Sequence, residues 1–167
     1  MISAQSGLLW CNRRRYKIND SDTFLLKLYT MEIPQVVRTY IETFTQPGLD
    51  TWIATFAPDG TYSDPNIPKP VPAHGLKEHF AGFFSGFPDG TCELVGIDAI
   101  SERVWLWRWI FHGTNTGPFR GIPPSGRSVT FPGCEIIEIR GDHVHSVQGY
   151  FDRLSIMSQL GLAGGKR

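Results

Sequence analysis

The chain has 167 residues, of which 41% are hydrophobic and 19% charged, a composition that fits one globular domain with its own core. Sixteen Lys and Arg residues balance 16 Asp and Glu residues, so no excess charge favours nucleic acid or anionic lipid as a partner. No apolar run approaches the ~20 residues that a membrane-spanning helix needs, and we expect no membrane partner.

The cysteine and histidine pattern argues against disulfides and metal. Cys11, Cys92 and Cys134 are widely spaced without a CxxC pair, which is a poor disulfide framework and a poor zinc set. We therefore expect a reducing compartment, the cytoplasm, with these cysteines as small buried hydrophobes. His143 and His145 share one strand face, but no third ligand accompanies them, and we predict no metal and no cofactor.

The first 31 residues differ from the rest of the chain. Their positive charges follow the apolar residues, the reverse of a secretory signal. The absence of acids before Asp20 gives only a weak similarity to an organellar presequence. We predict a loosely attached extension over residues 1–31, a domain over residues 32–162 and a short tail over residues 163–167.

Apolar residues recur at spacings of three and four in three segments that follow this extension, which is the period of an amphipathic helix. The pattern predicts helices over residues 33–44, 49–56 and 75–84. Asp59 and Gly60 predict a turn after the second helix. The segment "TYSDP" then predicts a brief strand, and the first two helices form a hairpin that leads the chain to it.

Beyond Pro88 the apolar period changes to two, which is typical of strands. Four strands are predicted, in the segments "TCELVGIDAI", "RVWLWRWIFHG", "RSVTFPGCEIIEI" and "HVHSVQGYF". A short helix within residues 152–162 closes the domain. Helices followed by a run of antiparallel strands favour an α+β fold, in which a curved, mainly antiparallel sheet wraps around packed helices.

These elements together resemble the SnoaL-like polyketide cyclase branch of the nuclear transport factor 2-like superfamily, which also contains ketosteroid isomerases. The most specific matches are "GTNTGPFRGIPPSGRSVTFPG", which looks like the glycine-rich crossover of the branch, and "YFDRLSIMSQLGL", which looks like its closing strand and helix. The resemblance covers residues 32–162. It implies a cone-shaped α+β barrel with an apolar pocket at its open end, and a homodimer.

Asp64 is the first candidate for catalysis. A carboxylate at a strand end that faces an aromatic cavity gains basicity through desolvation. The resemblance to ketosteroid isomerases matches Asp64 to their general base in a similar Asp-Pro element, and Tyr40 to the tyrosine that donates to the developing enolate. Their neutral acid falls near Glu135, although a register slip of one residue would reverse that side chain. The alternative is an Asx turn at Asp64 and a core position for Tyr40.

His112 and Asp152 form a second acid and base set. His112 ends the tryptophan strand, and histidine exchanges protons near neutral pH. Asp152 is the nearest match to the aspartate that serves cyclases of this branch in the ring-closing aldol step, but it also fits the N-cap of the last helix. Many SnoaL-like sequences carry a histidine at the centre of the crossover, where this chain has Asn115, an amide that accepts no proton.

The tryptophan strand has two faces, and the sequence does not decide which lines the pocket. Trp105, Trp107, Trp109 and Phe111 share one face, which is either a flat apolar wall for a ligand or a dimer surface. In the second case Arg108 and His112 would line the pocket. The residues that we predict to bind substrate are Trp52, Tyr62, Phe80, Trp107, Trp109, Asn115, Glu135, Gln148 and Tyr150.

The sequence therefore predicts a cofactor-independent enzyme that binds a hydrophobic carbonyl compound, polycyclic or of polyketide type. Proton abstraction alpha to the carbonyl would give an enolate, and the enolate would lead to aldol cyclisation or to isomerisation. Asp64 would be the base, Tyr40 the oxyanion donor, and His112 or Asp152 the residue that returns the proton. The alternative is a binding or interaction module with the same fold and no catalysis.

Overall fold

The computed structural model describes residues 8–11, 14–17, 31–44 and 48–162. The chain divides into two units, residues 1–32 and 33–167. The first unit contains β1 (Leu8–Cys11) and β2 (Arg14–Lys17), which pair in an antiparallel ladder. The sequence pattern predicted no regular structure here, because four residues are too few to reveal a strand period. Within the described ranges, no helix has the length and apolarity to cross a membrane.

The helices of the second unit follow the predicted periods. They are α2 (Gln35–Thr43), α3 (Leu49–Ala54), the short 3-10 helix η1 (Ala73–Gly75), α4 (Leu76–Gly86) and α5 (Arg153–Gln159). Helix α3 is two residues shorter than predicted, because Phe56 already belongs to the next strand. Helix α2 buries Val37 and Tyr40, which are one helical turn apart, and turns both toward the sheet.

Six strands form one curved sheet in the order β4-β3-β8-β7-β6-β5. Their bounds are β3 (Phe56–Ser63), β4 (Val71–Pro72), β5 (Thr91–Ala99), β6 (Val104–Thr114), β7 (Ser128–Arg140) and β8 (His143–Phe151). Strands β3 and β8 run parallel, and every other pair is antiparallel. The predicted α+β class is confirmed, but the sheet does not close into a barrel, since β4 and β5 are its edges.

The predicted turn at Asp59 and Gly60 is wrong, because both residues lie inside β3. The chain bulges there, and the register between β3 and β8 shifts between Phe56 and Thr61. A side chain at Gly60 would place a Cβ 2.9 Å from the carbonyl oxygen of Ala57. Glycine therefore marks a close backbone approach at this position rather than a chain reversal.

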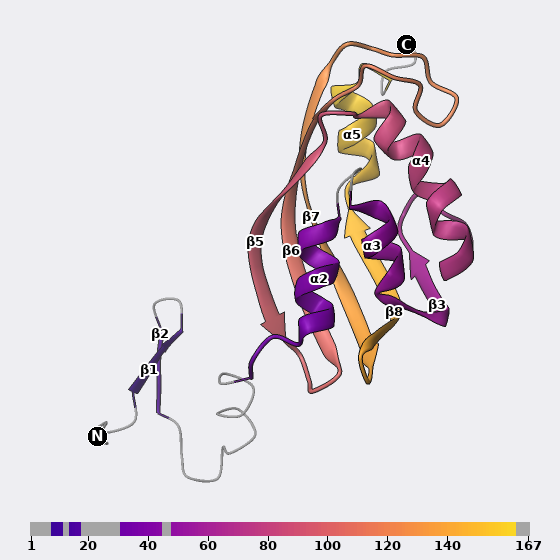
Figure 1. Cartoon of the computed structure of the whole chain (residues 1–167). Helices are drawn as coiled ribbons and strands as arrows, with labels where there is room; N and C mark the ends of the chain where they lie inside the picture. Colours follow the sequence, from indigo (N-terminus) through magenta and orange to yellow (C-terminus); the bar gives the residue numbers. More distant parts are fainter. Residues whose placement is uncertain (1–7, 12–13, 18–30, 45–47, 163–167) are drawn as a thin grey trace. The chain divides into compact units, whose positions relative to one another are not determined.

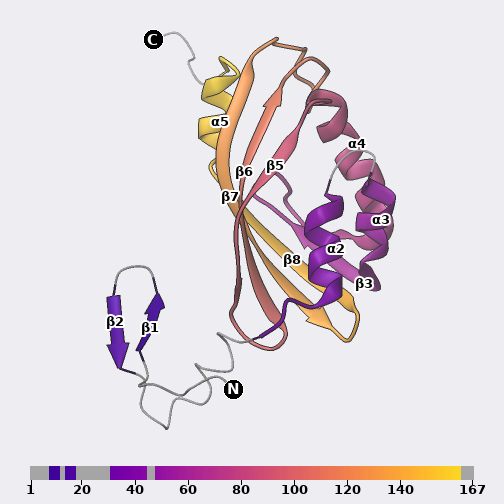
Figure 2. The same ribbon diagram turned by 60° about the vertical axis from the view of Figure 1, so that its left-hand side comes forward.

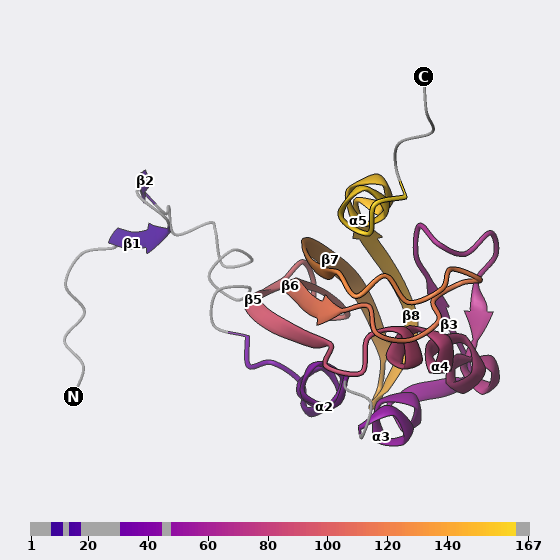
Figure 3. The same ribbon diagram turned by 90° about the horizontal axis from the view of Figure 1, so that it is seen from above.

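Helices α2, α3 and α4 lie on the concave side of the sheet (Figure 1, Figure 2). Viewed from above, strands β5 to β8 curve around these helices (Figure 3). The inner face of β6 carries Trp105, Trp107, Trp109 and Phe111, all at most 7% exposed. Its outer face carries the half-buried or exposed Leu106, Arg108, Ile110 and His112. The aromatic face of β6 is therefore the inner one.

The Gly- and Pro-rich segment between β6 and β7 is a long crossover, as predicted. Asn115 is fully buried at its base and donates to the carbonyl oxygens of Gly86, at 3.2 Å, and Gly117, at 2.8 Å. Its side-chain oxygen accepts from the amide of Ser125 at 2.9 Å. Asn115 thus ties the crossover to the end of α4, and this structural role accounts for an amide at the centre of the motif.

The tip of the crossover is a tight turn that presents a charged side chain. Phe119 and Ile122 pair with each other across Arg120 and Gly121. Both central residues have positive φ angles, 51° at Arg120 and 77° at Gly121. Two consecutive residues of this kind are the signature of a type I′ turn, in which a residue other than glycine, asparagine or aspartate is uncommon. The turn fixes the direction in which Arg120 leaves the loop.

We predict opposite stability effects for two glycine-to-alanine substitutions. A Cβ at Gly133 would lie 2.3 Å from the Trp109 ring, whereas a Cβ at Gly82 in α4 meets nothing within 4 Å. Gly133→Ala should lower the free energy of unfolding by about 1–3 kcal/mol through overpacking. Gly82→Ala should raise it by about 0.4–1 kcal/mol. Urea denaturation measures both, and a Gly133→Ala protein as stable as the wild type would contradict the packing described.

Candidate functional site

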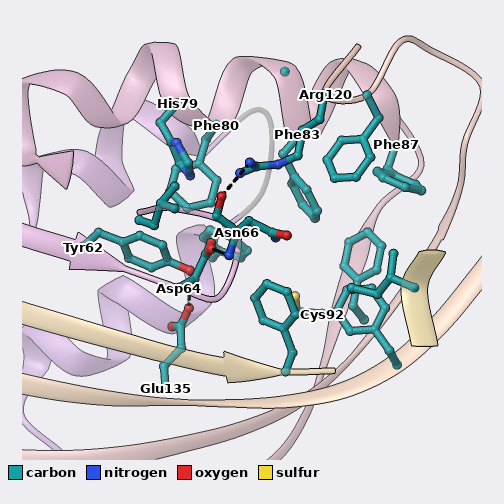
Figure 4. Close-up of a pocket in the computed structure, with 18 of the residues that line it drawn as sticks. Tyr62, Asp64, Asn66, His79, Phe80, Phe83, Phe87, Cys92, Arg120 and Glu135 are labelled. Carbon is teal, nitrogen blue, oxygen red and sulfur yellow. Dashed lines mark hydrogen bonds between the residues drawn. The ribbon is translucent and has the colours of Figure 1, made fainter. Parts of the chain in front are cut away.

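A cavity of about 360 Å³ lies between the inner face of the sheet and helix α4, within the usual range for small-molecule sites. Its walls are mostly aromatic. They comprise Trp109 and the phenylalanines at positions 44, 80, 83, 87, 111, 119, 131 and 151. Phe80, Phe83 and Phe87 follow one face of α4 and its end, and they stand opposite the strands (Figure 4). The cavity therefore suits an apolar ligand.

One end of the cavity is polar. Six polar side chains border it there and come from four separate parts of the domain (Figure 4): Tyr62, Asp64, Asn66, His79, Arg120 and Glu135. They lie at the end of β3 and the loop after it, on α4, at the tip of the crossover and on β7. Titratable groups gathered at one end of an apolar cavity are the usual arrangement of an active site.

Glu135 is the most deeply buried of these groups, with 2% of its surface exposed. Its two carboxyl oxygens accept hydrogen bonds from two tyrosine hydroxyls, Oε2 from Tyr40 at 2.8 Å and Oε1 from Tyr62 at 3.1 Å. Burial raises the pKa of Glu135 to about 7, although both hydroxyl donors lower it. Near neutral pH this carboxyl therefore exists in both forms, as a carboxylate and as a neutral acid.

Tyr40 lies behind Glu135 rather than in the cavity wall. Its side chain is fully buried, and its ring contacts Trp52 and Trp107 at centroid distances of 5.2 and 6.0 Å. Burial and the nearby Glu135 raise the pKa of the Tyr40 hydroxyl. Because the Glu135 carboxyl accepts this hydroxyl, Tyr40 acts on the cavity through Glu135. Trp52 and Trp107, predicted to bind substrate, belong to this same inner layer and form core.

Asp64 follows the last residue of β3 and borders the cavity with 8% of its surface exposed. Its Oδ1 accepts the backbone amide of Asn66 at 2.6 Å, which makes an Asx turn. Burial raises the pKa of Asp64, while the Asn66 amide and the charges of His79 and Arg120 oppose this shift. The catalytic and the structural interpretation of Asp64 are therefore compatible, since a turn-capping carboxyl also faces the cavity.

His79 and Arg120 are cavity residues that the sequence pattern did not single out. His79 is half-buried on α4, and burial lowers its pKa while Asp64 raises it. Arg120 donates from Nη1 to the carbonyl oxygen of Asn66 at 2.9 Å, which connects the crossover to the loop after Asp64. His79 lies three residues after Leu76 and four before Phe83, so the helical period alone could have placed it on the inner face.

The structure places His112 and Asp152 away from the cavity. His112 belongs to the outer face of β6, where its Nε2 lies 3.2 Å from Glu93 and its Nδ1 lies 3.3 Å from Thr130. The carboxyl of Asp152 caps helix α5, accepting the amides of Leu154 at 2.9 Å and Ser155 at 3.1 Å. Strand phase and capping explain these positions, and neither residue borders the cavity.

The remaining residues that we predicted to bind substrate fall into two groups, those that border the cavity and those that do not. Tyr62, Phe80, Trp109 and Glu135 border the cavity, as predicted. Gln148 and Tyr150 alternate along β8 with the buried Val147 and Gly149 and so point outward, and Tyr150 is 50% exposed. Phe151, in the opposite phase, is the residue of β8 that reaches the cavity.

Residues 34–160 match the family model for SnoaL-like polyketide cyclase. The chain belongs to this family. The match begins at the residue before α2 and ends after α5, so it covers the whole domain and leaves out the N-terminal unit. No protein of curated function matches the sequence.

Solved structures share the fold of this SnoaL-like domain at low sequence identity. AclR of Streptomyces galilaeus, provisionally assigned as a hydroxylase, has 20% identity and a TM-score of 0.66, over 75% of this chain and 92% of its own. IdmH of Streptomyces antibioticus, provisionally assigned as a polyketide cyclase, has 22% identity and a TM-score of 0.64, over 75% and 96%.

A third relative, from Catenulispora acidiphila, has a ketosteroid isomerase-like fold and was solved with trimethylamine. Its identity is 19% and its TM-score 0.64, over 81% of this chain and 100% of its own. Identities near one fifth establish a common fold and not a common reaction, because different chemistries occur on the same superfold. The reaction has to be inferred from the side chains that line the cavity.

We predict that Glu135 makes the stability of the protein fall as pH rises. The pKa of this carboxyl is about 7 in the folded protein, whereas the ordinary pKa of a glutamate, which applies to the unfolded chain, is 4.5. Between these pH values the folded state therefore holds one proton that the unfolded state has lost. The free energy of unfolding should then decrease on the order of 3 kcal/mol across this window. Glu135→Gln should remove this decrease, as measured by urea denaturation at a series of pH values.

Glu138→Gln is a matched control, since it removes a carboxylate from the outer side of the same strand. Asp64 remains in both variants, so its own contribution cancels in the comparison. If Glu135→Gln and wild type lost stability in parallel between pH 4.5 and 7, Glu135 would not carry the extra proton.

Proposed function

We propose that this SnoaL-like protein is a cofactor-independent enzyme that removes a proton alpha to the carbonyl of a hydrophobic compound. The observation that carries the proposal is the position of two carboxyls, Asp64 and Glu135, at the polar end of one aromatic cavity. Burial raises the pKa of both. A carboxyl with a raised pKa is a stronger base when ionised and a hydrogen-bond donor when neutral.

The two carboxyls take different roles in this proposal. Asp64 borders the cavity while its Oδ1 accepts the Asn66 amide, and its carboxylate is the group that accepts a proton from the substrate. Glu135, in its neutral form, donates to the carbonyl oxygen on which the enolate charge develops. The opposite assignment is less favourable, because Asp64 lies nearer the positive charges of His79 and Arg120, which stabilise its ionised form.

Tyr40 and Tyr62 are positioning residues. Each donates to one oxygen of Glu135, and together they fix the plane of its carboxyl. The rings around them exclude water, so a donor held in this way is already oriented when charge develops. Tyr40 therefore supports the oxyanion through Glu135, in place of the direct donation that the resemblance to ketosteroid isomerases implied.

The enolate would react within the same cavity. Attack on a second carbonyl of the substrate gives an aldol cyclisation, and reprotonation at another carbon gives an isomerisation. The family of this chain and the provisional assignment of IdmH support the first outcome. The aromatic walls favour a flat, unsaturated substrate of polyketide type, since ring-to-ring contacts add to the free energy of burial.

Binding without catalysis is the second candidate function. It is favoured by the Asx turn at Asp64, which gives this carboxyl a structural use. A binding protein of this kind would enclose a hydrophobic carbonyl compound and leave its protons in place. The two functions are therefore separated by proton exchange on a bound ketone.

We predict that Asp64→Asn lowers alpha-proton exchange by about 10²–10⁴-fold, the usual contribution of a general base. Asparagine keeps the oxygen that accepts the Asn66 amide but cannot take a proton. The measurement is deuterium incorporation into β-tetralone in D₂O by NMR. Asp59→Asn, at an exposed position of the preceding strand β3, is the control and should match wild type.

The exchange rates of the three proteins distinguish the two functions. Exchange that is fast in the wild type and in Asp59→Asn but slow in Asp64→Asn supports the proposal. Equal exchange in all three proteins would remove Asp64 as the base. If β-tetralone bound to the wild-type protein without any exchange, binding without catalysis would be the better account.

A further inference from the structure

We propose that His79 is the second proton-transfer residue of the cavity, the one that delivers a proton to the far reacting atom of the substrate. The inference rests on the proposed function, in which Asp64 removes the first proton. It concerns a residue on α4, an element that supplies no other acid or base to the cavity.

His79 is held at the cavity by rings and not by hydrogen bonds. Its ring contacts those of Tyr62 and Phe80 at centroid distances of 6.4 and 5.0 Å, and both neighbours border the cavity. Among the residues that the structure describes, none hydrogen-bonds to its two ring nitrogens. His112 differs, because Glu93 and Thr130 engage its nitrogens. The imidazole of His79 is therefore fixed in place while its nitrogens are free for a ligand.

The charges around His79 suit repeated protonation. Burial lowers the pKa of His79, Asp64 opposes this shift by stabilising the imidazolium, and the Arg120 guanidinium adds to it. A histidine with a lowered pKa gives up its proton readily once it has acquired one. Figure 4 shows His79, Arg120 and Asp64 around the same end of the cavity, with Glu135 further from His79.

The proton balance of an aldol cyclisation assigns a role to each group. Asp64 takes the alpha proton, and the electrons of the broken C–H bond form the enolate. The enolate carbon attacks the second carbonyl, whose oxygen becomes an alkoxide. The imidazolium of His79 protonates this alkoxide and becomes neutral. One proton enters the site on Asp64 and one leaves from His79, and the proton returns from Asp64 to His79 before the next turnover.

This assignment also constrains the substrate. Within the polar end of the cavity, its first carbonyl lies against Glu135 and its second acceptor lies near His79 and Arg120. A compound with one carbonyl would undergo exchange but could not complete the reaction at His79. The structure therefore favours a dicarbonyl compound, or an unsaturated ketone whose distal carbon receives the proton.

The experiment separates proton removal from proton return with one probe, androstenedione in its β,γ-unsaturated form. In D₂O, deuterium entering the recovered probe reports removal, and formation of the conjugated isomer reports return. We expect His79→Gln to keep the rate of proton removal within about threefold of wild type. The rate of proton return should fall at least tenfold. His74→Gln, at an exposed histidine of η1, is the control and should change neither rate.

A second variant guards against an effect on folding. His79→Ala should lose return in the same way, and free imidazole added to the solution should restore it, which a purely structural role would not allow. Return that is unaffected in His79→Gln would overturn the inference and indicate that Asp64 carries the proton both ways. A wild-type protein that exchanges the probe without ever conjugating it would also overturn it. Absence of both exchange and conjugation in the wild type would instead contradict the proposed function.

Discussion

The hydrogen bonds from Tyr40 and Tyr62 to the buried Glu135 are the interaction on which the rest of the site depends. A carboxyl at 2% exposure loses its hydration, and this cost is offset only where donors replace the water. The donors come from α2 and β3, whereas Glu135 lies on β7. These three residues therefore join helix α2 to strands β3 and β7. The same hydrogen bonds that offset the cost of burying Glu135 also orient its carboxyl toward the cavity.

The environment that encloses a ligand is also the one that tunes the acids and bases. The aromatic rings that line the cavity exclude water, and the resulting desolvation raises the pKa of Asp64 and Glu135 and lowers that of His79. A more polar lining would relax these pKa shifts. In the proposed function, the affinity of the cavity for an apolar ligand and its capacity for proton transfer would therefore have one physical origin.

The two faces of the sheet carry different kinds of side chain. On the outer face, polar side chains pair with one another in solvent: Arg108 forms an ion pair with Asp98, and the His112 ring lies within hydrogen-bond distance of Glu93. Such exposed pairs contribute little to stability. On the inner face, the crossover anchored by Asn115 carries aromatic and charged side chains to the cavity. Relatives with about one fifth identity keep this framework, and the lining residues decide the reaction.

The sequence by itself determined the type and order of the longer helices and strands from α2 to α5, because periods of 3.6 and two are local properties of the chain. It also singled out Asp64 at a strand end, and the resemblance to ketosteroid isomerases added Tyr40 and Glu135. The tertiary structure decided how these residues combine. Tyr40 reaches the cavity through Glu135, because its fully buried side chain on α2 lies in the core beyond Glu135 and does not border the cavity. The periodicity of the sequence does not show how deep in the core a buried side chain lies.

Because sequence periodicity does not show which elements pack together, the sequence misplaced some residues and missed others. His112 is in phase with Arg108, but only the packing of the helices showed which phase faces inward. His79 and Arg120 come from a helix and a loop that are far apart in the sequence, and only the fold brings them to Asp64. Periodicity assigns a side chain to a face, and long-range packing alone decides what that face meets.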